Sequence, residues 1–187
     1  EERKEKIKKN GKSKVKDKDH VYILGDLSMK NKSDLNEVFQ FLAELNGIKY
    51  LIPGNHDDER IKKIYSPLSI DEEKLLNKSK LFLLSQIEEI SVPMPGNLPA
   101  RKLVISHYPI YSFKSCGFNS TLLFGHIHNM YNQNRDFLEV LKKGIWTYRE
   151  DLKLNPAKAY NVGCMTPWMD FAPKTLSEIE DFDKHLI

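Results

Sequence analysis

Four short apolar runs in this chain each end in residues that can bind a metal ion. The runs read VYIL from Val21, IKYLIP from Ile48, KLVIS from Lys102 and STLLFG from Ser120. Polar side chains follow them at six positions: Asp26, Asn55, His56, His107, His126 and His128. A short apolar run bounded by a turn is typical of a buried strand. Because strands in parallel order bring the loops at their carboxyl ends to one edge of a sheet, we expect these side chains to form one site.

The order of the predicted elements indicates an α/β fold in one domain, residues 1–187. A helix that starts near Leu35 and ends at Gly47, with Asp34 and Glu37 at its start, lies between the first two predicted strands. Such a unit is typical of neighbouring parallel strands. Further strands begin near 80, 87, 102, 120 and 159 after short loops, and a last helix starts at the capping box of Thr175 and Glu178. This later order favours a mixed sheet or two packed sheets.

The composition is typical of a protein from a reducing compartment and does not indicate a membrane-spanning segment. The two cysteines, Cys116 and Cys164, are far apart and form no C-x-x-C pair, so neither a disulfide framework nor a zinc knuckle is indicated. No apolar run approaches the ~18 residues that span a bilayer, and we predict a cytoplasmic protein without a membrane partner. The formal charge of +3 is concentrated in residues 1–18, which hold nine Lys/Arg against four Asp/Glu. We interpret this run as a solvated helix end or loose tail rather than a phosphate-binding surface.

The residue types at the strand ends suit transition metals. Histidine nitrogens together with carboxylate or amide oxygens favour manganese, iron, cobalt or zinc, whereas magnesium and calcium prefer oxygen almost alone. His126 and His128 are alternate residues of an extended segment and face the same side, so they can serve one ion or two ions about 4 Å apart. An isolated Gly-Asp is usually a turn, and a single histidine is usually a packed or surface residue. Four of the six histidines fall at predicted strand ends, which argues against coincidence.

In chain order, four motifs resemble those of the calcineurin-like metallophosphoesterases: GD at Gly25, GNHD at Gly54, SHYP at Ser106 and GHIH at Gly125. The resemblance runs from about Val21 to Leu176. It implies a four-layer αββα sandwich of two mixed β-sheets flanked by helices, with two metal ions at the strand ends.

The resemblance also implies a role for each candidate residue. Asp26 would bridge both ions, while Asn55, His107 and His126 would complete the ligands of the second ion, and His128 would bind the first. His56 would be the catalytic residue that faces the substrate phosphate and steadies or protonates the leaving oxygen. Asp57 would either support the ligands or cap a turn.

One family motif does not precede Asp26: an opening strand that ends in Asp-x-His and supplies two ligands of the first ion. His20 cannot replace it, because it stands at the start of its strand. The chain would then be a truncated product, a protein with a single ion in the second site, or a catalytically inactive relative. We expect truncation, with an N-terminal strand missing upstream of Glu1.

We therefore predict a metal-dependent phosphoesterase that hydrolyses phosphodiesters through a metal-bound hydroxide, with two divalent ions in the complete protein and manganese favoured. The alternative is a metal-deficient, catalytically inactive scaffold for protein binding, which would have no need of exposed imidazoles at strand ends. The expected partner is a phosphate ester. Basic residues at the start could contact nucleic acid, but no interleaving of aromatic and basic residues supports that partner. Residues 163–174 would either wall a substrate pocket or cover the core.

Overall fold

The computed structural model describes residues 2–28, 34–62, 68–94, 96–116, 118, 120–128, 136, 139–140 and 158–183. Its helices include α1 (Glu2–Lys14), α2 (Leu35–Ala43), α3 (Glu59–Lys62), α4 (Ile70–Ser79) and α6 (Leu176–Asp183). Its strands are β1 (His20–Leu24), β2 (Ile48–Ile52), β3 (Leu81–Leu83), β4 (Ile87–Val92), β5 (Arg101–Ser106), β6 (Ser120–Phe124) and β7 (Lys158–Asn161).

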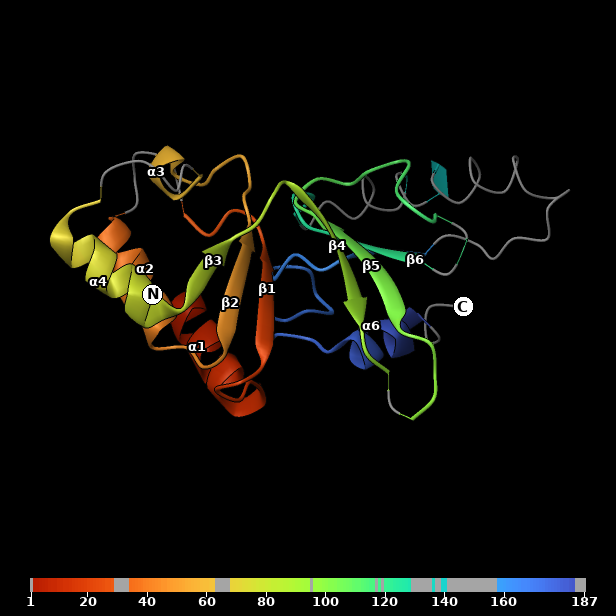
Figure 1. Cartoon of the computed structure of the whole chain (residues 1–187), viewed down its shortest axis with the longest axis horizontal. Coiled ribbons are helices and arrows are strands. Elements are labelled where there is room, and N and C mark those ends of the chain that lie inside the picture. Colours follow the sequence, from red (N-terminus) through yellow and green to blue (C-terminus); the bar gives the residue numbers. More distant parts are fainter. Residues whose placement is uncertain are drawn as a thin grey trace, which may run out of the picture.

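The strands form two sheets that lie side by side in the molecule (Figure 1). The first sheet has the order β1-β2-β3 and is parallel throughout its described strands, whereas we predicted a mixed sheet. The second has the order β4-β5-β6-β7 and is mixed, because β4 runs antiparallel to β5 while β5, β6 and β7 are parallel. The predicted α/β architecture of two packed sheets flanked by helices is confirmed.

Strand register brings the functional loops to a common level. Leu24 at the end of β1 pairs with Ile52 at the end of β2, and Ser106 at the end of β5 pairs with Phe124 at the end of β6. In each pair of parallel strands, the two loops that follow the strands therefore begin at the same edge of the sheet. The predicted ligands lie in these loops.

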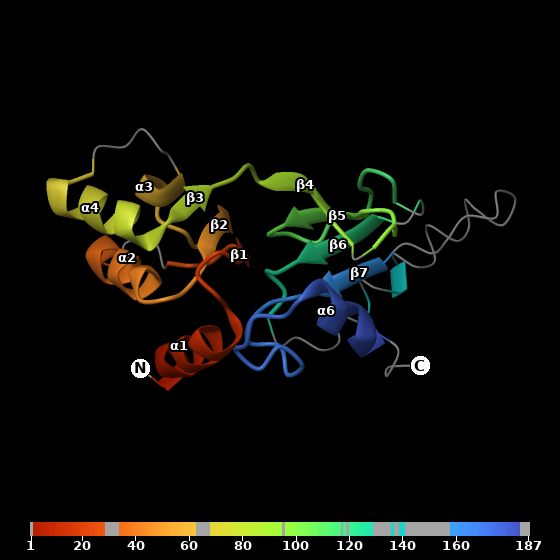
Figure 2. The ribbon, with the colours of Figure 1, turned by 60° about the horizontal axis from the view of Figure 1, so that its bottom comes forward.

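Helices α2 and α4 cover the outer face of the first sheet (Figure 2). Apolar residues of α2 at helical spacing, Leu35 and Phe39, pack on Leu51 of β2. Between the two sheets, Ile52 packs against Leu103 and Ile105 of β5. Full burial of such a side chain contributes about 1.5–3 kcal/mol, so these contacts hold the two sheets against each other beside the strand ends.

Two predicted helix starts agree with the structure, whereas helices α3 and α4 were not predicted. Asp34 caps α2 by accepting from the N–H of Asn36 (2.9 Å), and Glu178 accepts from the N–H of Thr175 (2.8 Å) before α6. Helix α4 begins with a capping box between Ser69 and Glu72.

The segment 163–174 covers the core rather than forming regular structure. Met169 is buried, and the Trp168 indole N–H donates to the Asn161 carbonyl (3.1 Å). On its outer side Asp170 pairs with Lys6 of α1. This agrees with the covering role, one of our two interpretations.

Among the residues that the structure describes, we find no helix with the length and hydrophobicity of a membrane span. The single domain over 1–187 and the cytoplasmic location stay predictions.

Candidate metal centre

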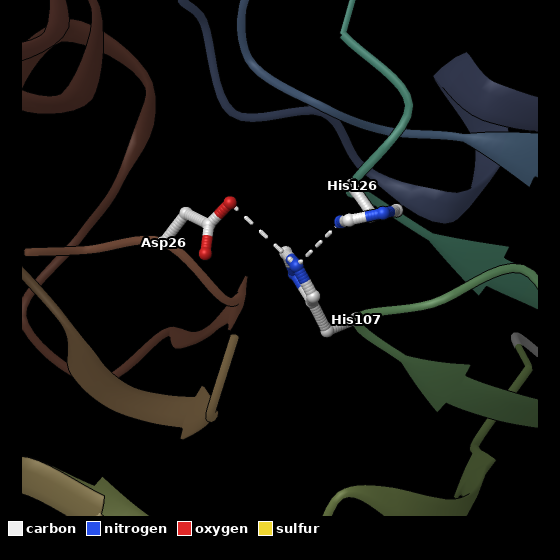
Figure 3. Close-up of side chains that lie close together, drawn as sticks. All are labelled: Asp26, His107 and His126. Carbon is white, nitrogen blue, oxygen red and sulfur yellow. Dashed lines mark hydrogen bonds and ion pairs between the residues drawn. The ribbon is translucent and has the colours of Figure 1, made fainter. Parts of the chain in front are cut away.

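Four predicted ligands meet between the two sheets. Asp26 follows β1 by two residues, and Asn55 follows β2 by three. From the second sheet, His107 follows β5 directly and His126 follows β6 by two residues. Figure 3 shows Asp26, His107 and His126 pointing toward one another from separate loops. The strand ends of both sheets thus contribute to one centre.

The ligand atoms lie within a small volume. Asn55 Oδ1 is 3.0 Å from His107 Nε2 and 3.0 Å from His126 Nδ1, and these two nitrogens are 3.2 Å apart. Asp26 Oδ2 lies 3.6 Å from His107 Nε2. The ligand atoms of Asp26, His107 and His126 all lie within 4.8 Å of one another, which is close enough for a single ion to bind all of them.

The tautomer of His107 is set by the first sheet. Its Nδ1 lies 2.8 Å from the Leu24 carbonyl oxygen at the end of β1. A carbonyl can only accept, so Nδ1 carries the proton and donates. The lone pair of Nε2 is therefore directed at Asn55 and His126. A metal-binding histidine commonly donates its other ring N–H in this way, which fixes the ring and raises its basicity.

The donor set fits a divalent cation. Asp26 Oδ1 accepts from the His56 N–H (3.0 Å), whereas Asp26 Oδ2 is buried and has no hydrogen-bond donor among the described residues. An unpartnered buried carboxylate oxygen is costly. Three of the four converging atoms (Asp26 Oδ2, Asn55 Oδ1 and His107 Nε2) are acceptors that repel one another unless they share a cation. Nitrogen and oxygen donors in this combination suit a transition metal.

Electrostatics keep His126 in the form that can bind metal. Partial burial lowers the pKa of its imidazole, and the neighbouring His107 lowers it further, while the Asp26 carboxylate acts in the opposite direction. His128 and His56 also lower this pKa, so both rings lie within electrostatic range. His126 is therefore neutral at pH 7, with a free ring lone pair.

Two ligands stand on backbone in the left-handed region. Asp26 has φ 55° and His126 has φ 60°. Such a conformation costs a non-glycine residue about 1–3 kcal/mol and persists only where the surroundings fix it. Asp26 and His126 are two of six described non-glycine residues with positive φ, and these two both belong to the ligand cluster.

Asp57 ties the loop after β1 to the loop after β2. Its fully buried carboxylate accepts from the N–H of Asp26 (3.0 Å), of Gly54 (2.8 Å) and of Ser28 (2.8 Å). The Ser28 hydroxyl in turn accepts from the N–H of Asp58 (2.8 Å). Asp57 therefore positions Asp26, and the first of our two interpretations of this residue describes what it does. Ser28 was missed in the sequence, because no local pattern marks it.

Two glycines are required by close approach. A Cβ at Gly25, which has φ +83°, would lie 2.1 Å from His107 Nδ1, and a Cβ at Gly54 would lie 2.4 Å from Asp26 Oδ1. Any residue larger than glycine at position 25 would displace the His107 ring, and one at position 54 would displace the Asp26 carboxylate.

The remaining predicted residues lie at the margin of the cluster. His56 and His128 are both exposed, as His126 is, but neither belongs to the group of converging ligand atoms. The group of metal-capable histidines and carboxylates found in the described part of the chain contains Asp26, His107 and His126 but not His128. The catalytic role of His56 and the ligand role of His128 stay predictions.

Comparisons with known proteins agree with this arrangement. A sequence profile described as Calcineurin-like phosphoesterase matches residues 2–139. Among solved structures, the chain is similar to the protein of unknown function AQ665 from Aquifex aeolicus, with 22% identity and a TM-score of 0.55, over 96% of this chain and 84% of that chain. At this identity the likeness shows the fold alone. A search of curated proteins found no match.

Proposed function

Because the chain belongs to the calcineurin-like phosphoesterase family, we propose that it is a metal-dependent phosphoesterase that acts on phosphodiesters. The observation that supports this most is the convergence of Asp26, Asn55, His107 and His126, with one buried carboxylate oxygen that lacks a donor. The proposed substrate of this centre is a phosphate ester.

We propose that the centre binds two ions, with manganese preferred and iron, zinc or cobalt as substitutes. Asp26, Asn55, His107 and His126 would hold one ion, and Asp26 with His128 would contribute to the other. When bound, divalent cations lower the pKa of water and neutralise charge on the phosphoryl oxygens. The nitrogen-containing donor set favours a transition metal over magnesium or calcium.

His56 is suited to handle the proton of the leaving group. Its backbone N–H donates to Asp26 Oδ1, so the residue stands on a turn that is fixed to the ligand cluster. Its ring is exposed and lies within electrostatic range of His126. We propose that this ring faces the phosphate and holds or delivers the proton at the leaving oxygen.

A metal-deficient scaffold is the less well supported alternative. A protein-binding surface does not require strained backbone at both Asp26 and His126, nor an unpartnered buried carboxylate oxygen. Both features cost stability and are understandable where a cation binds.

Metal content and turnover, measured together, test the proposal. The wild type and three histidine or asparagine variants would be loaded with Mn²⁺, dialysed, analysed for metal, and assayed with bis(4-nitrophenyl) phosphate and 4-nitrophenyl phosphate. We expect Asn55→Ala and His126→Ala to lose metal and turnover together, and the diester to be the better substrate. His20→Ala is the matched control, because His20 is the first residue of β1, at the opposite end of the strand from the centre, and its ring packs at a tilt against that of Tyr50 in β2. A wild type without bound metal or turnover would contradict the proposal in favour of the scaffold.

A further inference from the structure

One exposed aromatic side chain lies directly against the metal centre. The ring of Tyr108 is 4.8 Å from that of His107 and 4.6 Å from that of His126, measured between centroids. The planes are inclined at 75° and 61°, so neither imidazole stacks on the phenol ring. Tyr108 keeps 45% of its surface exposed. A partly exposed aromatic residue thus lies directly against two of the predicted metal ligands.

The position of this ring is fixed by the loop that carries it. The hydroxyl of the buried Ser106 donates to the Tyr108 carbonyl (2.6 Å). Further along the loop, Ile110 and Phe113 pack against the buried cluster of the second sheet. The loop is therefore anchored on both sides of Tyr108, and the exposure of the ring is a property of the folded site rather than of a loose segment.

We propose that Tyr108 forms a binding subsite for a planar aromatic substituent of the substrate, such as an aryl group or a nucleobase. This inference rests on the proposed function and names the substrate class for the same centre. Because the Tyr108 ring contacts two of the predicted metal ligands and is exposed, an ester substituent of a phosphate bound at this centre would lie within reach of the phenol. An aromatic substituent can stack on that ring, whereas an alkyl substituent gains much less. Stacking of a base on an aromatic side chain changes affinity by about tenfold or more.

Two other roles of Tyr108 make different predictions. If its hydroxyl bound the phosphate, removal of the hydroxyl alone would weaken every phosphate ligand. If its ring served only to wedge the imidazoles in place, its loss would lower metal content and weaken all ligands alike. Only the subsite makes affinity depend on whether the ligand carries a planar group.

The experiment compares two ligands that differ by the base. Binding of AMP and of ribose 5-phosphate to the Mn²⁺-loaded chain would be measured by isothermal titration calorimetry, with metal content determined on the same samples. We expect the wild type to bind AMP about tenfold more tightly than ribose 5-phosphate. Tyr108→Ala should abolish this preference while keeping its metal and its affinity for ribose 5-phosphate, and Tyr108→Phe should retain the preference.

Tyr111 supplies the matched control, because it is an exposed tyrosine on the same loop, and Tyr111→Ala should keep the preference. Equal affinity of the wild type for the two ligands would overturn the subsite. The same conclusion would follow if Tyr108→Phe lost as much as Tyr108→Ala, or if Tyr108→Ala lost metal and both ligands together. Turnover of bis(4-nitrophenyl) phosphate by the same wild-type sample separates the two proposals: turnover without a base preference overturns the subsite alone, and a base preference without turnover overturns the phosphoesterase alone.

Discussion

Replacement of Asp57 should destabilise the whole domain, because one buried carboxylate holds two functional loops together. Its Oδ2 accepts from the N–H of Asp26 and of Gly54, and its Oδ1 accepts from the N–H of Ser28. In Asp57→Asn one carboxylate oxygen becomes an NH₂ group. This group must then face either the Asp26 and Gly54 N–H groups or the Ser28 N–H group, and it cannot accept from them. Each lost hydrogen bond to a charged group is worth about 1.5–3 kcal/mol. We expect a loss in the free energy of unfolding of about 3 kcal/mol for Asp57→Asn and about 4.5–9 kcal/mol for Asp57→Ala, in which all three backbone N–H donors lose their partner.

Urea unfolding of the metal-free protein measures this loss without a contribution from ion binding. Asp71→Asn is the matched control, since Asp71 is exposed in the first turn of α4 and should change stability by no more than about 0.5 kcal/mol. If Asp57→Asn were as stable as Asp71→Asn, the carboxylate would not be the tie between the loops, and our account of how Asp26 is positioned would be wrong.

Three further predictions concern catalysis, backbone geometry and pH. His56→Ala should keep its metal, because only the backbone N–H of this residue contacts a ligand, and should lower turnover by about 10²–10⁴ in the diester assay; loss of metal would contradict the assigned role. Gly25→Ala should weaken Mn²⁺ binding measured by calorimetry, because the added Cβ displaces the ring of His107. Gly96→Ala is the control, since Gly96 also has a positive φ but has open space around it, and this variant should keep the affinity. Equal effects of the two substitutions would show that the clash with His107 is unimportant. Hydrogen bonds from the Lys14 ammonium and the Thr175 backbone N–H lower the pKa of Glu178 to about 2. The contribution of Glu178 to the free energy of unfolding is therefore present above its ordinary pKa of 4.5 and is lost as pH falls toward 2. Glu178→Gln should therefore flatten the fall in urea stability between pH ~5 and ~3, and an unchanged fall would show that this carboxylate has no part in it.

The strand ends were predictable from the sequence because their signals are local. Apolar runs such as VYIL before Gly25 and STLLFG before His126 carry both the strand and its end within a few residues. Parallel pairing then brings such ends to one edge without further information. For this reason the convergence of Asp26, Asn55 and His107 could be expected before any coordinates were known.

Helix α4 escaped prediction because its apolar signal is weak. Its sequence is dominated by charged residues, and its packing depends on α2, which lies far away in the chain. The capping box of Ser69 and Glu72 was readable in the sequence and would have placed the start of this helix.

Long-range contacts account for the features of the site that the sequence did not show. The tie from Asp57 to Ser28 joins residues 29 positions apart, and the hydrogen bond that fixes the tautomer of His107 reaches Leu24, 83 positions away. The contact of Tyr108 with His126 likewise forms only once β5 and β6 are paired. Local patterns carry no signal for such contacts.

Anomalous diffraction from crystals of the Mn²⁺-loaded protein tests the central claim most directly, which is that the four converging side chains share a cation. We predict an anomalous peak between the two sheets, bonded to Asp26 Oδ2, Asn55 Oδ1, His107 Nε2 and His126 Nδ1. The absence of a peak there, or a peak elsewhere that leaves these four atoms without a shared ion, would contradict the account.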